Sequence, residues 1–445
     1  MSKGKLTFLL FFFSPYLLAA LAHFLPTDTN VCFCCPPPLF SYYRRASANF
    51  ALGKLKLSLL DYRRAKKIAP NDKDVQRKLQ QSEKAYKIEK FSQALAAPEE
   101  EIVPEYSKIV IEDIIVEDSY AGSRMDIDEE GKEVITLDFI LAMIEDFKAG
   151  KKIHKRYASV IILRTLALLQ SLPNVVHIDI PEGGKFTVCG DVHGQFFDFL
   201  NIFELNDMPS ESNPYLFNGD FVDRGSWSAE IIFTLFALKC LYPNSLHLAR
   251  GNHESKSMNK IYGFEGEIQA KYTSKMADVF REVFCWLPLG HIINEKAFVV
   301  HGGLFSSDDV TIADLQKFDR NREPPDEGHM CEMLWSDPQA PFGRAPSKRG
   351  VAIQFGPDIT KAFLERNNLE LVIRSHEVKD EGYEIEHNGW LVTVFSAPNY
   401  CDHMGNKGAF ITFGSDMKPN FTQFSAVPHP DIKPMAYASS YMNMF

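Results

Sequence analysis

The spacing of apolar residues changes twice along the chain, and each change marks a boundary between regions. Apolar residues recur at helical spacing over residues 39–97, whereas residues 98–132 show no regular period. From residue 133 to residue 425, short apolar runs alternate with helical patterns, the first two of which cover 136–149 and 154–172. Alternating strands and helices predict an α/β domain in this last region.

The segment 1–38 departs from the rest of the chain because it contains a long apolar stretch. Two lysines precede an apolar stretch over residues 6–25, which has about the 20 residues that span a bilayer. A small-residue triplet at 20–22 offers a cleavage site for a signal peptidase. The pattern indicates either a membrane or secretory signal, with membrane contact only if the segment is retained, or an artefact of gene prediction.

Residues 39–97 contain one tetratricopeptide-like repeat followed by a further helix. The repeat is a helix-turn-helix unit of about 34 residues in which small and large packing residues have fixed places. Those places are occupied here by Tyr42, Ala46, Ser58, Tyr62, Ala65 and Pro70. Only one copy is found, although about three stacked repeats are needed for a stable array. Two ordinary amphipathic helices are the alternative interpretation.

Residues 98–132 are strongly acidic. Between residues 99 and 130 there are twelve Asp or Glu side chains and only two Lys or Arg side chains. This imbalance, together with two prolines, predicts a linker solvated by its own charge. The last residues, 426–445, are expected to form a C-terminal tail.

The composition narrows the class of protein. The 445 residues allow two or three domains of about 150 residues each. With 45% hydrophobic residues, 24% charged residues and a net charge of -10, the chain reads as an ordinary globular protein, and nucleic acid is not expected as a partner. Its eight cysteines lack the spacing of a disulfide framework. A reducing compartment, cytoplasmic or nuclear, fits this cysteine usage.

Five short apolar runs each end in polar residues. The carboxyl ends of strands in α/β sheets are where ligand sites form, so these residues are candidates for one common site. The five stretches are KFTVCGDVHGQ, YLFNGDFVDRG, LHLARGNHE, AFVVHGG and LVIRSHE. The polar residues in them are Asp191, His193, Asp220, Asp223, Asn252, His253, His301 and His376.

This set of side chains has the chemistry of a metal site. Carboxylate, amide and imidazole groups together suit Mn, Fe or Zn. So many ligands exceed the needs of one ion, and two ions about 3.5 to 4 Å apart would clamp both oxygens of a phosphoryl displacement. A single His or Asp at a strand end is usually structural, but five such turns in order argue against a structural role alone.

The motifs GDVHGQ, GDFVDRG, GNHE, HGG and SAPNYC resemble the signature set of the metal-dependent serine/threonine protein phosphatases, the PPP family. The stretches YYRRASANFALGK and VPHPDIKPMAYA and the acidic linker are similar to its type 5 branch, whose members carry an N-terminal tetratricopeptide domain. The resemblance implies an α/β fold: a metallophosphoesterase (calcineurin-like) β-sandwich flanked by helices, preceded by an all-α tetratricopeptide remnant.

The resemblance also implies a role for each motif position. Asp220 would bridge two metal ions. The implied metal ligands are Asp191, His193, Asp220, Asn252, His301 and His376. The implied catalytic residues are His253 and Asp223, and the implied substrate-binding residues are Arg224, Asn252, Arg349 and Tyr400.

The implied function is hydrolysis of phosphoserine and phosphothreonine in proteins. A hydroxide bridging two divalent ions would attack in line, and His253 would protonate the leaving oxygen. Mn is the expected activator in vitro, with Fe or Zn as alternatives. Type 5 members also bind the C-terminus of a heat-shock chaperone through a three-repeat groove. Here Arg44 matches a clamp position but Phe40 stands where the family has Lys, so we expect no chaperone binding.

Two other functions remain open at this point. The first is a metallophosphoesterase that acts on nucleotides through the same metal pair. The second is a scaffold whose repeat binds partners while the phosphatase fold is inactive. Hydrolysis of a phosphopeptide and not of a cyclic nucleotide would separate all three interpretations.

Overall fold

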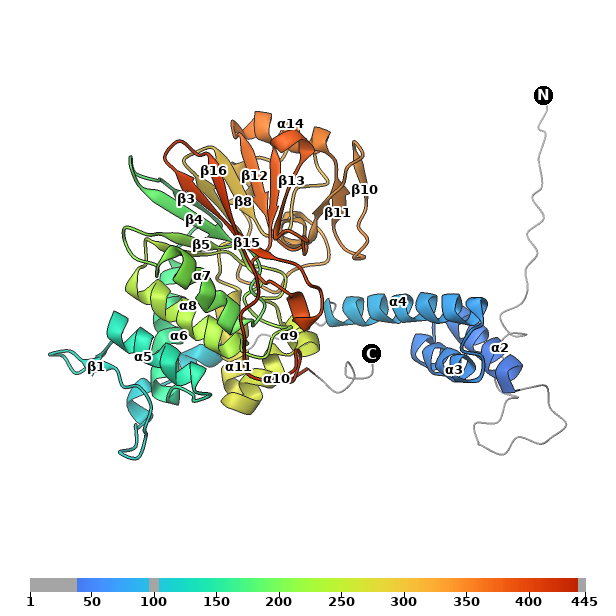
Figure 1. Ribbon diagram of the computed structural model, residues 1–445, viewed down its shortest axis with the longest axis horizontal. Coiled ribbons are helices and arrows are strands. Elements are labelled where there is room, and N and C mark those ends of the chain that lie inside the picture. The colour runs from blue at the N-terminus through green and yellow to red at the C-terminus, as the bar shows by residue number, and fades with distance from the viewer. Residues whose placement is uncertain (1–37, 96–103, 439–445) are drawn as a thin grey trace, which may run out of the picture. The chain divides into compact units, whose positions relative to one another are not determined.

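The computed structural model describes residues 38–95 and 104–438. The chain divides into two compact units at residue 97. We call the described part of the first the helical unit and that of the second the main unit (Figure 1). The apolar stretch at 6–25 lies outside the described residues. Among those described, no helix is both long and apolar enough to cross a membrane.

The helical unit consists of three helices around a small core. The helices are α2 (Pro38–Ala51), α3 (Leu55–Ile68) and α4 (Lys73–Leu95). The buried apolar residues that they share are Ala46, Leu59, Tyr62 and Leu79. The first two helices occupy the positions expected for a single repeat, and the third is the expected following helix.

The main unit is built on two β-sheets that pack face to face. The six-stranded sheet contains β3 (Val175–Ile178), β7 (Gly290–Ile293), β8 (Ala297–Val300), β12 (Leu371–Arg374), β13 (Tyr383–Glu386) and β14 (Leu391–Val394). The five-stranded sheet contains β4 (Lys185–Cys189), β5 (Tyr215–Phe217), β6 (Leu246–Leu248), β15 (Gly408–Gly414) and β16 (Pro419–Phe424). One apolar cluster joins the two sheets, so the expected sandwich is confirmed.

Alternation along the strands places each side chain. In β5, Leu216 belongs to the cluster between the sheets, while Tyr215 and Phe217 belong to the cluster beneath the helices. Successive residues of a strand point to opposite faces, and both faces of this sheet are covered. This explains why the strand reads as a continuous apolar run.

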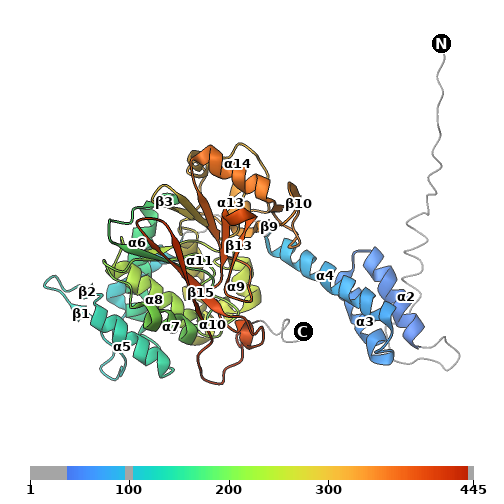
Figure 2. The same cartoon turned by 45° about the horizontal axis from the view of Figure 1, so that its top comes forward.

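Helices cover both outer faces of the sandwich (Figures 1 and 2). The helices that share the apolar cluster with the five-stranded sheet are α5 (Leu137–Lys148), α6 (Lys155–Gln170), α7 (Phe196–Asn206), α8 (Ser228–Leu241), α10 (Phe264–Lys271) and α11 (Ser274–Phe284). The short α9 (Lys256–Tyr262) immediately precedes α10. Near the six-stranded sheet lie α12 (Ile312–Leu315), α13 (His329–Trp335) and α14 (Pro357–Asn367), of which the last two are labelled in Figure 2. Phe363 of α14 packs on Phe298 with ring centroids 5.4 Å apart.

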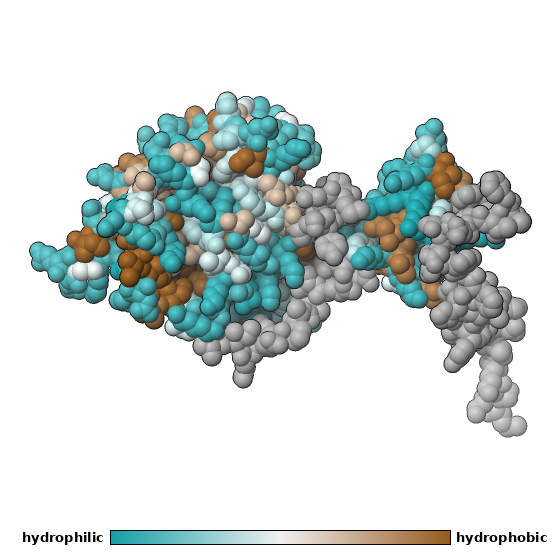
Figure 3. Space-filling model, turned by 90° about the horizontal axis from the view of Figure 1, so that it is seen from below, coloured by the Kyte–Doolittle hydropathy of each residue, from teal (hydrophilic) through white to brown (hydrophobic). Residues whose placement is uncertain are grey.

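Two small sheets complete the main unit. One is the hairpin of β1 (Asp126–Ile127) and β2 (Glu133–Val134), and the other joins β9 (Asp337–Pro338), β10 (Arg344–Pro346) and β11 (Ile353–Phe355). The second places Arg349 in the loop between β10 and β11. The face of the main unit seen in Figure 3 is mostly hydrophilic, with an apolar patch at its lower left.

The prediction of a solvated linker over 98–132 is wrong for its described residues from 104 onward. This stretch begins with short helices η1 (Glu105–Lys108) and η2 (Ile111–Asp113). The backbone N–H groups of Glu105 and Tyr106 donate to Glu282 at 2.8 and 3.0 Å. Five apolar side chains spaced among the acids pack on the main core: Tyr106, Ile109, Ile111, Val116 and Tyr120. Their burial outweighs the composition, and the stretch belongs to the main unit.

Candidate active site

The five polar turns predicted from the sequence meet at one edge of the sandwich. Asp191 follows β4, Asp220 follows β5, and Asn252 follows β6 in the five-stranded sheet. His301 follows β8 and His376 follows β12 in the other sheet. Parallel pairing of β5 with both β4 and β6, and of β8 with β12, brings these strand ends together.

Several of these residues have left-handed backbone conformations. Positive φ angles occur at His193 (40°), Asp220 (52°), Asp223 (70°), Arg224 (69°) and His376 (71°). Such angles are unfavourable for residues with a side chain and persist only where the surroundings enforce them. Their concentration in three of the five turns shows that the fold strains its backbone at this place.

The polar atoms of the turns lie within a few ångströms of one another. Nε2 of His193 is 3.4 Å from Oδ2 of Asp220 and 3.6 Å from Oδ2 of Asp191. Nε2 of His301 is 3.4 Å from Oδ1 of Asp220 and 2.9 Å from Oδ1 of Asn252. All of these side chains are buried. Asp220 therefore lies at the centre of the cluster.

The donor atoms fall into two groups that could each hold a metal ion. One group is His193, Asp220 and His253, and the other is Asp220, His301 and His376, with ligand atoms within 4.8 Å of one another in each. Asp220 belongs to both, as a bridging ligand requires. The first group contains His253 where the resemblance implied Asp191.

The surroundings of the histidines and carboxylates also fit bound cations. Nδ1 of His193 lies 3.0 Å from the carbonyl of Val222, and Nδ1 of His301 lies 2.8 Å from that of Asn218. A ring N–H held by a carbonyl leaves Nε2 free as a ligand. Burial raises the pKa of Asp220 to about 8. Positive ions would offset the burial of this carboxylate.

His253 differs from the other histidines in its partner. Its Nδ1 lies 2.8 Å from Oδ2 of Asp223. The same carboxylate accepts hydrogen bonds from Nδ2 of Asn259 at 3.1 Å and from the backbone N–H of Phe264 at 2.9 Å. Burial raises the pKa of Asp223 to about 7, and burial followed by Arg224 lowers the pKa of His253. Asp223 thus fixes the orientation of the His253 ring.

Two arginines approach the cluster from different elements. Arg224 follows Asp223 directly, and its guanidinium lies over the Tyr262 ring at 3.8 Å from the centroid. Its Nε is buried and has no hydrogen-bond partner. Arg349 donates to Asp337 through Nε at 2.6 Å and Nη2 at 3.0 Å. Both arginines could bind an anion, and the unpartnered Nε of Arg224 is a donor for one.

Tyr400 lines the same place, as the resemblance implied. It lies in η4 (Tyr400–Asp402), and its ring centroid is 5.2 Å from that of His193. Burial raises the pKa of its hydroxyl well above the ordinary value. The phenol therefore stays protonated and can donate a hydrogen bond.

Sequence reasoning missed three residues that hold the site together. The carboxylate of Glu254 accepts backbone N–H groups of Asp220, Phe221 and Gly251, each at 2.8 Å. Tyr262 and Asp337, described above with the two arginines, are the others. Glu254 is the last residue of the GNHE motif, so the sequence offered a signal for it. No local sequence pattern links Tyr262 to Arg224 or Asp337 to Arg349.

Two protein families match the chain. The family described as "Calcineurin-like phosphoesterase" matches residues 184–380, which carry all the predicted ligands. The family described as "PPP5 TPR repeat region" matches residues 79–177, from the end of the helical unit into the main unit.

Individual relatives agree with these families. "Serine/threonine-protein phosphatase 5" of Solanum lycopersicum is 66% identical over 331 residues, which are 74% of this chain and 59% of that relative. Its namesake in Homo sapiens is 54% identical over 406 residues, 91% of this chain and 80% of the relative. A solved Saccharomyces cerevisiae phosphatase, described as similar to human phosphatase PP5, has 44% identity and a TM-score of 0.65, covering 68% of this chain and 100% of its own.

Proposed function

Because the chain belongs to the serine/threonine-protein phosphatase 5 family and is a serine/threonine protein phosphatase, we propose that it hydrolyses phosphoserine and phosphothreonine esters at the cluster around Asp220. The observation that carries the proposal is the place of Asp220 in both groups of ligand atoms. A carboxylate shared by two ions is what a two-metal phosphoesterase site needs.

The proposed metal ligands are those implied by the sequence. They are Asp191, His193 and Asp220 for one ion, and Asp220, Asn252, His301 and His376 for the other. When bound, two divalent ions would supply a water nucleophile at neutral pH and positive charge for the phosphoryl oxygens. Mn, Fe and Zn all suit this set of oxygen and nitrogen donors.

The two arginines would bind the phosphate. Arg224 offers its buried, unpartnered Nε to the anion, and stacking on Tyr262 keeps the guanidinium in one place. Arg349 is oriented by its two bonds to Asp337. Asn252 and Tyr400 would add hydrogen bonds to the phosphoryl oxygens. Rigidly held donors stabilise the charge that develops in the transition state without reorganising.

His253 would donate a proton to the leaving oxygen. Its bond to Asp223 uses Nδ1, so Nε2 is free to face the substrate. In the absence of substrate, burial and then Arg224 lower the pKa of His253. A phosphate dianion at Arg224 would oppose the effect of that arginine, so substrate binding favours the protonated form. A serine or threonine alkoxide is a poor leaving group, which makes this proton important.

The proposed partners are phosphoserine and phosphothreonine proteins. Chaperone binding is not proposed. Arg44, which matches a clamp position, lies over the ring of Phe40 at 4.3 Å from its centroid. A single arginine that is already engaged makes a weak clamp for a carboxylate.

The proposal is tested by removing ligands and following metal and activity together. Asp191→Asn and His301→Ala should lose bound metal and turnover of a phosphoserine peptide in parallel, whereas Asp179→Asn, an exposed aspartate after β3, should keep both. Metal measured by mass spectrometry and rates measured with added Mn give the two readouts. Full activity of stripped protein kept in chelator would falsify the metal mechanism.

A further inference from the structure

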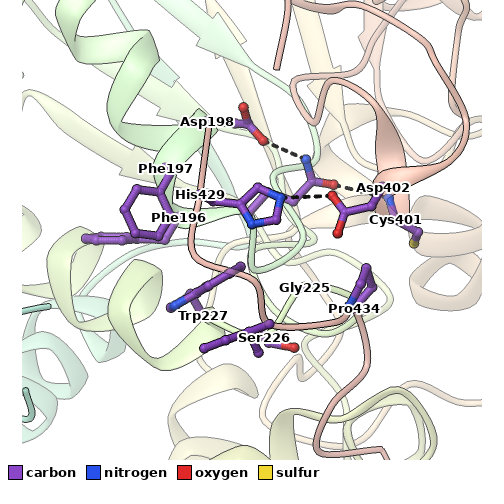
Figure 4. A pocket seen from close by; sticks show the side chains of 12 residues that line it. Phe196, Phe197, Asp198, Gly225, Ser226, Trp227, Cys401, Asp402, His429 and Pro434 are labelled. Atoms are coloured by element: carbon purple, nitrogen blue, oxygen red, sulfur yellow. Dashed lines mark hydrogen bonds and ion pairs between the residues drawn. The ribbon is translucent and has the colours of Figure 1, made fainter. Parts of the chain in front are cut away.

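The C-terminal residues 427–438, which we call the strap, run back across the main unit beside the Arg224 turn. The backbone N–H of Val427 donates to Oδ1 of Asp198 at 2.8 Å. Nε2 of His429 lies 3.1 Å from Oδ1 of Asp402, and its ring packs on Trp227 with centroids 5.3 Å apart (Figure 4). The strap is therefore anchored at its beginning.

The strap borders a small pocket of the main unit. The pocket is lined by strap residues His429, Ile432 and Pro434 and by residues that include Ser226 and Trp227 (Figure 4). Its volume is about 20 Å³. A cavity of that size holds about one water molecule.

The second half of the strap bonds directly to the turn that carries Arg224. Ser226 Oγ donates to the carbonyl of Lys433 at 2.8 Å and accepts the N–H of Ala436 at 3.3 Å. The backbone N–H of Met435 donates to the carbonyl of Arg224 itself at 2.7 Å. Ser226 is buried. One serine hydroxyl thus joins two strap residues to the turn.

Arg224 needs such support because its backbone is strained. Both Asp223 and Arg224 have left-handed φ angles, 70° and 69°. The N–H of Arg224 donates to the carbonyl of Tyr262 at 3.1 Å, and its carbonyl accepts from the strap. A strained conformation persists only when neighbours enforce it. The strap therefore supplies the hydrogen bond to the backbone carbonyl of Arg224, through the N–H of Met435.

We propose that the strap holds the Arg224 guanidinium in its phosphate-binding position and that Ser226 is the positioning residue that couples them. The proposal rests on the function above, in which Arg224 binds the phosphate. Ser226 acts through Arg224 and touches no substrate. Loosening the strap therefore weakens phosphate binding and leaves the metal ligands in place.

The first test is Ser226→Ala in the full-length, metal-loaded protein. We expect KM for p-nitrophenyl phosphate and the inhibition constant of inorganic phosphate to rise about fivefold to tenfold, the order for a lost buried hydrogen bond. The maximal rate and metal content should change much less. Ser171→Ala is the matched control, since it removes a hydroxyl bond of 2.7 Å to Leu168 far along the chain from the strap.

A double-mutant comparison separates this proposal from the proposed function. Arg224→Ala alone should raise both constants, and Ser226→Ala should add almost nothing in that background, because both changes remove the same interaction. If Arg224→Ala leaves phosphate binding unchanged, the proposed role of Arg224 fails. If Arg224→Ala weakens phosphate binding and the two effects simply add, the coupling through Ser226 is wrong.

Shortening the chain gives an independent test that leaves Ser226 intact. Ending the chain after residue 432 removes the bonds from Lys433, Met435 and Ala436, whereas ending it after residue 438 keeps them. We expect the shorter chain to bind phosphate more weakly than the longer one at equal metal content. Equal inhibition constants for the two chains, measured after circular dichroism shows both folded, would overturn the role of the strap.

Discussion

The two units of the molecule differ in the size of the apolar core that stabilises them. The main unit surrounds its site with two sheets and their helices, and most of its catalytic candidates are buried. The helical unit has only four residues in its buried apolar cluster and depends on polar pairs such as Arg45 with Asp61 at 2.6 Å. It also leaves Phe40 and Leu57 about half exposed, at 49% and 50%. A strained, charged site needs the larger core, and a lone repeat cannot provide one.

The largest expected effect is a loss of activity, and it should occur when an aspartate is replaced in the main unit but not when one is replaced in the helical unit. Asp220→Asn should reduce phosphopeptide turnover more than about 10²-fold, since even the loss of an outer partner of a metal ligand costs about 10 to 100-fold. Asp61→Asn should leave turnover unchanged and lower the melting temperature of the helical unit, because Arg45 loses its buried partner. Rates and differential scanning calorimetry measure the two outcomes. Similar losses of activity in both variants would contradict the separation.

The next effect concerns proton transfer in the main unit. His253→Asn should lower turnover of an alkyl phosphate by about 10² to 10⁴-fold and have less effect on an aryl phosphate, whose leaving group needs no proton. Metal content should stay near that of the unchanged protein. An equal loss on both substrates, accompanied by loss of metal, would instead make His253 a ligand, as its place in one of the two groups allows.

Removing the docked acidic stretch should destabilise the main unit. A chain that begins at residue 133 lacks the apolar side chains of Tyr106, Ile109 and Tyr120 that a chain beginning at residue 104 keeps. We expect a loss of roughly 2 kcal/mol in the free energy of unfolding, because these three side chains are partly buried and a fully buried apolar side chain contributes about 1.5 to 3 kcal/mol. Urea unfolding of the two chains measures it. Identical urea midpoints for the two chains would mean that this stretch is a solvated linker after all.

The buried His247 should make its own contribution to the stability of the main unit smaller as the pH falls. Burial, and then Lys239, lowers the pKa of His247 to about 3. Below about pH 6.5, His247 binds a proton in the unfolded chain but stays neutral in the folded chain. The stability that neutral His247 contributes is therefore fully present above pH 6.5. It is lost as the pH falls below that value, by up to about 1.4 kcal/mol per pH unit. Residues 38–95 contain no histidine. Between pH 6.5 and 5, the free energy of unfolding of the main unit should fall less, or rise more, in His247→Gln than in the unaltered chain, and an identical pH slope would exclude this cause.

The smallest expected effect is on binding of an acidic chaperone C-terminal peptide. One exposed arginine pairs with a carboxylate for about 0 to 1 kcal/mol, so Arg44→Ala should change nothing that titration calorimetry detects. The unaltered chain should also show no binding. Micromolar affinity that disappears in Arg44→Ala would mean that the single repeat retains a working clamp.

The sequence by itself determined the α/β class and the candidate residues of the site. The polar residues follow apolar strands by a few positions, so a local pattern is enough to place them at strand ends. Asp191, Asp220 and His301 could be chosen in this way because parallel strands bring their carboxyl ends to one edge. The sequence shows Glu254 as part of the GNHE motif but does not predict its role. Its carboxylate accepts three backbone N–H groups from two different turns, and no local pattern indicates that the turns meet.

Only the tertiary structure decided which distant segments support that site. Composition describes residues 104–125 as a charged linker, but their apolar side chains find a surface on the main core. Asp337 reaches Arg349, and the strap reaches Arg224, across separations that no short pattern spans. Burial and hydrogen bonding depend on partners far away in the chain, whereas the position of a residue at the end of a strand depends on its neighbours.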